Sequence, residues 1–353
     1  MVRGAAAGGA AAESVAESRS VRLWGRMSQF AEGVAFHALR GAGERAYTRD
    51  SVAWDVRSDK RTRGEVRPYS LETGVIEGAS GSGRARCDEV GMGNGSDVLV
   101  VVKAEVGVPK REAPGEGRIE VAVEFTASGG DSFMGRGGDD VAAEVASALE
   151  DGLRGALDLG GLCLVHNQRC WVLHVDATVL GVKGSLVDCA SMAAKAALLD
   201  TRLPRLRVLP SEERPGEVEL ELDEDAETDP IDCTRVPLCV TVSRIGGYPV
   251  LDTSWEEEVV AESRLGVFVN AAGEVCALRQ SGPGGVQPQH ILESISTAIS
   301  VAKDVNLGLE AHVADLRERR LRGEVENTFL IAGHGKGDTP AEDFATGADT
   351  PAA

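Results

Sequence analysis

The stretch CWVLHVDATVLGVKGSLVDCASMAAKAALLDTRLPRLRV, residues 170–208, decides the fold of this chain. Its first part, 170–180, is rich in Val and Leu and predicts a buried strand. A tight turn follows around Lys183 and Gly184. The small residues over 186–199 predict a helix that can pack close to a sheet. Enzymes often place a catalytic carboxylate where such a strand ends, but here a lysine enters the turn.

The sequence around this unit predicts two α/β halves. Val-rich strands are expected over 97–106 and 117–125, and an amphipathic helix then precedes the strand at 170–180. The pattern recurs with strands at 237–245 and 265–280, the latter interrupted by a hairpin turn. A long helix then follows, with an apolar stripe of Ile291, Leu292, Ile295, Ile299, Ala302 and Leu309. The recurrence indicates a diverged internal duplication whose halves pack as one unit.

Composition predicts where the folded part begins and ends. Residues 1–54 are expected to be an N-terminal extension, partly disordered, with one possible helix that includes Phe30, Val34 and Leu39. The first half covers 55–205 and the second covers 233–322. Between them, 206–232 is predicted to be a solvated acidic loop, because its stretch from 211 holds eleven acidic residues and one arginine. Residues 323–353 are expected to be a disordered tail.

Bulk composition limits the classes of function. With 42% hydrophobic but only 4% aromatic residues, the core must be aliphatic. No apolar run approaches the ~20 residues that span a bilayer, so no membrane contact is expected. The net charge of −19 argues against a general nucleic-acid binder, although basic clusters lie at 57–67 and 201–207. The seven cysteines show no C-x-x-C spacing, which predicts reduced, mostly buried thiols and no metal site.

Several motifs occur in an order that resembles the RNase PH family. They are SLETGVI at 70–76, GRGGDD at 135–140, KAALLDTRLP at 195–204 and LDTSWEEE at 251–258, and the likeness extends over 55–316. The resemblance implies an α/β (α+β) RNase PH-like fold, with two βαβα-type halves similar to domain 2 of ribosomal protein S5. It also implies a place among RNase PH-type subunits in the six-membered ring of the RNA exosome. Such rings carry S1/KH cap subunits and thread single-stranded RNA.

The same resemblance implies which residues active members would need. Those members cut RNA with phosphate, and they carry an Asp-Gly-Gly turn followed by an arginine. Here the turn reads Lys183, Gly184 and Ser185, and an apolar residue stands in the place of the arginine. A second, phosphate-binding arginine is expected on the helix before 170, where this chain has Ala146 or Ser147. Lys183 therefore marks a degenerate active site, and neither catalysis nor a cofactor is expected.

We expect a non-catalytic exosome ring subunit that helps to form the RNA channel, located in the nucleus and nucleolus and also in the cytoplasm. The alternative is an active phosphate-dependent 3′-to-5′ exoribonuclease that uses Asp176 or Asp188 as an unusual acid. Asp188 is otherwise explained as a favourable charge near the start of its helix. The predicted RNA contacts are Lys110, Arg111, Arg118 and Arg136. The predicted subunit-interface residues are Lys60, Arg61, Arg63 and Arg67.

Overall fold

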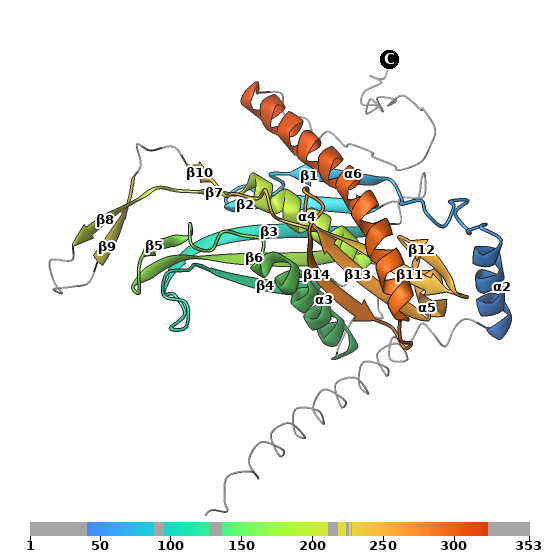
Figure 1. Ribbon diagram of the computed structural model, residues 1–353. Helices are drawn as coiled ribbons and strands as arrows, with labels where there is room; N and C mark the ends of the chain where they lie inside the picture. The colour runs from blue at the N-terminus through green and yellow to red at the C-terminus, as the bar shows by residue number, and fades with distance from the viewer. Residues whose placement is uncertain are drawn as a thin grey trace, which may run out of the picture.

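The computed structural model describes residues 41–87, 95–126, 136–210, 218–223, 226 and 228–323. The first half is built on a six-stranded sheet (Figure 1). Its strands run in the order β1 (Tyr69–Thr73), β2 (Gly81–Cys87), β3 (Ser96–Gly107), β6 (Arg169–Gly181) and β4 (Arg118–Phe125), with β5 (Cys163–Val165) paired to β6. The β4–β6 pair is parallel and the other pairs are antiparallel. The strands predicted over 97–106, 117–125 and 170–180 are confirmed.

The second half is a four-stranded antiparallel sheet. Its strands follow the order β12 (Tyr248–Leu251), β11 (Leu238–Ile245), β13 (Ser263–Val269) and β14 (Val275–Ser281). The short helix α5 (Trp255–Val260) lies between β12 and β13, and the long helix α6 (Pro288–Leu321) follows β14. The predicted turn between β13 and β14 closes with a hydrogen bond from the Gly273 amide to the Asn270 carbonyl. The strands predicted at 237–245 and 265–280 and the long helix after them are confirmed, whereas β12 and α5 are not predicted by the sequence pattern.

Helix α4 (Leu186–Asp200) lies between the two sheets and is buried continuously from residue 188 to residue 198. Its small side chains let it approach β2 very closely. A Cβ atom on Gly83 would lie 2.6 Å from the backbone nitrogen of Ala197, so this contact requires glycine. At the other side of α4, the Lys195 Nζ donates to Asn306 Oδ1 at 2.5 Å and to Glu310 Oε1 at 2.7 Å. The fully buried Lys195 therefore fastens α6 to the central helix.

The remaining helices pack at the edges of this core. Helix α3 (Arg136–Arg154) contacts β4, α4 and β14, and helix α2 (Ala42–Ala53) contacts α5. The apolar stripe predicted along α6 is correct for Ala302 and Leu309, which are buried, and wrong for Leu292, whose exposed fraction is 71%. The helix predicted around Phe30 and the predicted C-terminal tail lie outside the described residues.

The acidic segment differs from its predicted form. Where the sequence predicts a loop, β8 (Leu206–Pro210) and β9 (Val218–Leu222) pair as a two-stranded antiparallel sheet. Two very short strands, β7 (Arg202–Leu203) and β10 (Asp229–Pro230), pair at its base. Figure 1 shows β8 and β9 extending away from the main body. The sequence VELEL, which alternates apolar and acidic residues, accounts for β9, because a strand needs alternation rather than low charge.

Membrane spans and metal clusters are both absent from the part of the chain that the structure describes. No helix within the described ranges has the length and apolar content needed to cross a membrane. Among the same residues, no group of three His, Cys, Asp or Glu side chains is arranged to hold a metal ion. The cysteines are buried or half-buried as predicted, except Cys276, which is exposed because its strand β14 is the edge of its sheet.

Candidate functional site at the junction of the two halves

The turn between β6 and α4 contains the degenerate position predicted from the sequence. Lys183 is half-buried, and its amide donates a hydrogen bond to the Ser96 Oγ at 2.9 Å. The Ser96 hydroxyl donates in turn to the carbonyl of Gly184 at 2.7 Å. The Lys183 carbonyl accepts from the Trp255 amide of the second half at 3.2 Å. The backbone of this turn thus forms hydrogen bonds with the start of β3 and with the start of α5.

Arg67 and Asp252 form a buried ion pair beside the same turn. The guanidinium donates to both carboxylate oxygens, with Nη2 2.7 Å from Oδ1 and Nε 3.0 Å from Oδ2. Its remaining donors reach the carbonyls of Lys183 at 3.0 Å and Gly184 at 3.3 Å. Desolvation of the buried carboxyl opposes ionisation, but the charge and hydrogen bonds of Arg67 together with the charge of Arg61 outweigh it and lower the pKa of Asp252 to about 2. Arg67 therefore ties the first half to the second through a charged aspartate.

Further contacts beside this ion pair join the first half to the second half. The buried Arg57 donates to both carboxylate oxygens of Glu257, at 2.8 and 2.6 Å. The Ser185 amide donates to Glu258 Oε1 at 2.7 Å. Gly184 has a φ of +100°, and a Cβ there would lie 2.2 Å from the Thr253 carbonyl oxygen. Only glycine fits, because the turn lies directly against the backbone of the second half.

Asp188 lies in the first turn of α4, where it lines a cavity of only about 30 Å³ together with Arg67 and Asp252. It is buried, and its two oxygens accept from the Thr241 hydroxyl at 2.6 Å and the Thr241 amide at 2.9 Å. Burial raises the pKa of Asp188 to about 7, and nearby Asp252 raises it further, against the two hydrogen bonds from Thr241. Asp176, the other alternative acid, is exposed on β6. The structure does not bring Asp176 and Asp188 together, because one faces solvent and the other faces β11.

An arginine does reach the helix where a phosphate-binding arginine is expected, but from another strand. Arg279 of β14 donates to the Ser147 Oγ at 3.0 Å and to Asp151 Oδ2 at 3.2 Å on α3. Sequence reasoning misses it because Arg279 and Ser147 are 132 positions apart. Its ion pair with Asp151 uses donors that a phosphate would need.

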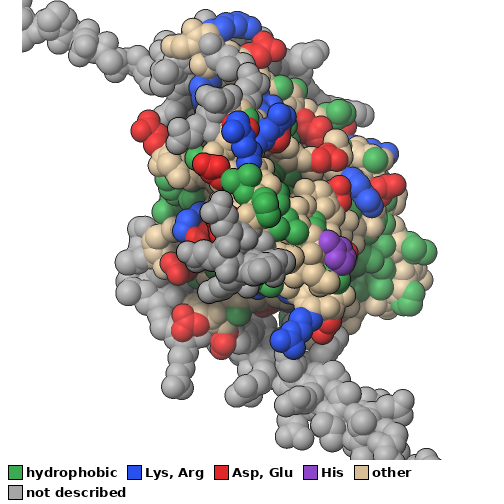
Figure 2. Space-filling view, turned by 90° about the vertical axis from the view of Figure 1, so that its left-hand side faces the viewer, with side chains coloured by type: hydrophobic (Ala, Val, Ile, Leu, Met, Phe, Trp, Pro, Cys, Tyr) green, Lys and Arg blue, Asp and Glu red, His purple; other side chains and the backbone are tan. Residues whose placement is uncertain are grey.

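The predicted RNA contacts do not form one basic strip. Lys110 and Arg111 are exposed on the loop between β3 and β4. Arg118 begins β4, is half-buried and forms an ion pair with Glu120. Arg136 is the first residue of α3, and its side chain is outside the described part of the structure. Figure 2 shows basic, acidic and hydrophobic side chains interspersed over the face viewed there.

The predicted interface residues divide into two groups. Arg67 is only 2% exposed, and Arg61 donates to Asp59 at 2.6 Å and to Asp252 at 2.9 Å. Both therefore hold this chain's own halves together and have little surface to offer a partner. Lys60 is exposed, and Arg63 lies 4.6 Å from the ring centroid of Tyr248. The prediction of a contact with another subunit applies to Lys60 and Arg63 alone.

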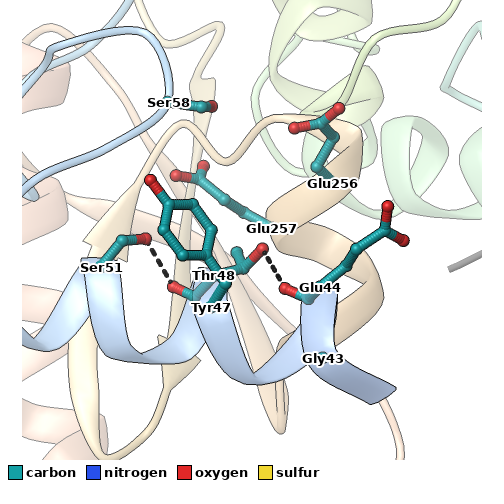
Figure 3. A pocket seen from close by; sticks show the side chains of 8 residues that line it. All are labelled: Gly43, Glu44, Tyr47, Thr48, Ser51, Ser58, Glu256 and Glu257. Carbon is teal, nitrogen blue, oxygen red and sulfur yellow. Dashed lines mark hydrogen bonds between the residues drawn. The ribbon is translucent and has the colours of Figure 1, made fainter. Parts of the chain in front are cut away.

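A large cavity in the described part of the chain lies elsewhere, between α2 and α5 (Figure 3). It has a volume of about 360 Å³, and its lining includes the carboxylates of Glu44, Glu256 and Glu257. None of the described residues that line this cavity is a lysine or an arginine. Glu257 is paired with Arg57, but the carboxylates of Glu44 and Glu256 would repel a phosphate, so this cavity is not suited to a nucleotide or to RNA.

A strand, turn and central helix shared by two α/β halves define the class of this protein as an RNase PH-type fold. The chain belongs to the 3′ exoribonuclease (RNase PH) family: domain 1 of that family matches residues 65–204 and domain 2 matches 235–301.

Its relatives include the exosome complex component Rrp42 of Methanopyrus kandleri, which is 35% identical over 260 residues, covering 73% of this chain and 92% of the relative. Similar solved structures include an Archaeoglobus fulgidus exosome with RNA bound to the active site, at 26% identity and a TM-score of 0.62, covering 75% of this chain and 97% of that one. An archaeal exosome core matches at 26% identity and a TM-score of 0.60, with coverages of 76% and 96%.

Proposed function

We propose that this chain is a ring subunit of an RNA exosome, that it helps to form the RNA channel, and that it has no catalytic activity of its own. Its partners would be other RNase PH-type ring subunits, S1/KH cap subunits and single-stranded RNA. The relatives support membership of such an assembly, since a chain named as an exosome component is similar over 92% of its length. Nucleus, nucleolus and cytoplasm are the proposed locations, which fluorescence of a tagged chain can test.

The observation that carries the non-catalytic part of the proposal is Lys183. A phosphorolytic reaction needs a carboxyl group near the leaving oxygen, as proton donor or metal ligand. An ammonium group can neither bind a divalent cation nor complete a pair of carboxylates. The neighbouring donors are also occupied: Arg67 is bound to Asp252, and Arg279 is bound to Asp151. The junction has the contacts of a structural clamp rather than those of an open phosphate site.

The alternative, an active phosphorolytic exoribonuclease, has one observation in its favour. Asp188 has a pKa of about 7, which suits a general acid at neutral pH. Its position argues against that role. Both carboxylate oxygens are occupied by Thr241, and the side chain is buried under α4. A general acid must come within hydrogen-bond distance of the substrate, and the cavity beside Asp188, of about 30 Å³, is too small to admit the end of an RNA strand.

One experiment tests catalysis and another tests assembly. The purified chain, alone and with its ring partner, is incubated with 3′-single-stranded RNA, phosphate and magnesium. We expect no nucleoside diphosphate from the chain alone and no loss of the complex's activity in a Lys183→Ala variant. Release of nucleoside diphosphate by the chain alone would overturn the non-catalytic assignment.

Affinity purification with mass spectrometry should recover five further RNase PH-type subunits, and their absence would overturn the exosome assignment.

A further inference from the structure

Two cysteines face each other across the β5–β6 hairpin. Cys163 and Cys170 are direct partners in the antiparallel register. The flanking Trp171 amide donates to the Leu162 carbonyl at 2.8 Å, and the Cys163 amide donates to Gly160 instead of to Cys170. The cysteines are therefore a non-hydrogen-bonded pair. In such pairs the Cα atoms are about 4.5 Å apart and both side chains leave the same face of the ladder.

This spacing is suitable for a disulfide, whose Cα atoms are usually about 4.4–6.8 Å apart. Both thiols are reduced in this structure. Cys163 is half-buried, whereas Cys170 has no exposed surface. Burial raises the pKa of the Cys170 thiol, nearby Arg118 opposes this and neighbouring Cys163 adds to it. Cys163 is consequently the thiol that a small oxidant reaches first.

The hairpin is connected to the loop that carries two of the predicted RNA contacts. At the hairpin tip, the Asn167 amide donates to the Pro114 carbonyl at 2.9 Å. At its base, the Gly117 amide donates to the Leu159 carbonyl at 2.7 Å. These two bonds bracket the β3–β4 loop on its C-terminal side. A covalent link across the hairpin would therefore stiffen the support of that loop.

We propose that Cys163 and Cys170 form a reversible disulfide within the chain when the protein meets a hydroperoxide. The Cys163 thiolate attacks the peroxide; an S–O bond forms, the O–O bond breaks, and the peroxide's other oxygen leaves as water or an alcohol after taking up a proton. The Cys170 thiolate then attacks the sulfenic sulfur and displaces hydroxide, which is protonated to water. Overall, the two thiols lose two protons and two electrons, and the hydroperoxide takes them up and is reduced to water and an alcohol, or to two waters.

The sequence provides a clean assay for this link. Trypsin cleaves after Arg154, Arg169 and Lys183, so it separates the two cysteines into peptides 155–169 and 170–183, each with one cysteine. The full chain is treated with hydrogen peroxide, its remaining thiols are alkylated, and the digest is examined by mass spectrometry without reduction. We expect the two peptides to be joined, with two hydrogens fewer than their sum, and to separate after treatment with dithiothreitol.

Matched variants make the result decisive. Cys276→Ser, which removes an exposed thiol outside the pair, should leave the link unchanged, whereas Cys163→Ser and Cys170→Ala should each abolish it. Absence of the joined peptides under conditions that oxidise Cys276 to its sulfenic acid would overturn the proposal. Joining of isotope-labelled to unlabelled chains in a mixture would overturn the intrachain assignment. Hydrogen exchange at the amides of residues 115–117 should slow on oxidation, and an unchanged rate would refute the effect on the loop.

Discussion

At the β6–α4 turn, the contacts of individual residues show how the two halves of the chain are held together. A lysine, Lys183, takes the place of the carboxylate, yet its backbone makes three hydrogen bonds, of which the one from the Trp255 amide links it to the second half. Arg67 and Arg57 are both fully engaged by carboxylates from the second half. Removing one member of a buried ion pair leaves a charge without a partner, which is far more costly than losing both.

The Arg67–Asp252 pair gives a prediction for stability. Arg67→Met should lower the free energy of unfolding by about 3 kcal/mol, because the buried Asp252 loses its two-oxygen contact with Arg67 and keeps the single ion pair with Arg61. The double variant Arg67→Met with Asp252→Asn should recover a large part of that loss, because asparagine is neutral and tolerates the φ of +44° at this position. Urea unfolding at pH 7 measures both. Arg205→Met, at the exposed pair with Asp229, is the control and should leave the unfolding curve nearly unchanged. If Arg67→Met and Arg205→Met lowered the free energy of unfolding equally, the buried ion pair would not be what holds the two halves together.

Asp188 gives a prediction for pH. Its pKa is raised from 3.8 to about 7, so the folded state favours the protonated form. The stabilisation this provides is complete below about pH 4 and is lost as the pH rises toward 7. Asp188→Asn should therefore be more stable than the wild type in urea unfolding at pH 8, by about 2–4 kcal/mol, with a smaller difference at pH 5. A variant less stable than the wild type at pH 8 would contradict this.

Single residues can be predicted from the sequence only where local pattern decides their environment. Lys183 stands out because it interrupts a recognisable turn. The partner of Arg67 cannot be predicted in this way, because Asp252 is 185 positions away and no local periodicity relates them. Leu292 is assigned to the core by its place near the apolar stripe, but its side chain leaves α6 on the solvent side, with 71% of it exposed.

At the scale of elements, the strongly periodic segments are predictable and the contacts between them are not. The strand, turn and helix at β6–α4 follow from Val alternation, glycine and small residues. The acidic hairpin of β8 and β9 escapes prediction because its charge suggests a solvated loop. Its alternation carries the signal for strands, since each acidic residue points away from the apolar face.

The turn itself can be tested by adding one methyl group. Gly184→Ala should cost at least about 3 kcal/mol, because it combines a positive φ with a Cβ 2.2 Å from the Thr253 oxygen. Gly247 is the matched control, since it also has a positive φ, +86°, but no heavy atom lies within 4 Å of the place that its Cβ would take. Gly247→Ala should cost only about 1–2 kcal/mol. Thermal unfolding of both variants gives the comparison, and equal costs would show that the junction tolerates the added atom.

At the scale of the whole molecule, the two halves share one central helix and cannot separate without exposing it. Helix α4 contacts strands of both sheets, and Lys195 extends that connection to α6. The outer surface of the molecule stays available for partners. The β8–β9 hairpin is the clearest such surface, because its cross-strand pairs place six apolar residues on one face: Leu206, Val208, Pro210, Val218, Leu220 and Leu222.

This hairpin face gives the last prediction. Val208 and Leu222 are 46% and 52% exposed, which is unusual for neighbouring apolar residues on an isolated two-stranded sheet unless a partner covers them. The double variant Val208→Glu with Leu222→Glu should reduce recovery of the other ring subunits about tenfold in affinity purification, since burying two charges would cost more than about 1.4 kcal/mol. Its own unfolding should change little. Leu292→Glu, at an even more exposed position on α6, is the control and should assemble normally. Unimpaired assembly of the double variant would exclude the hairpin from the ring interface.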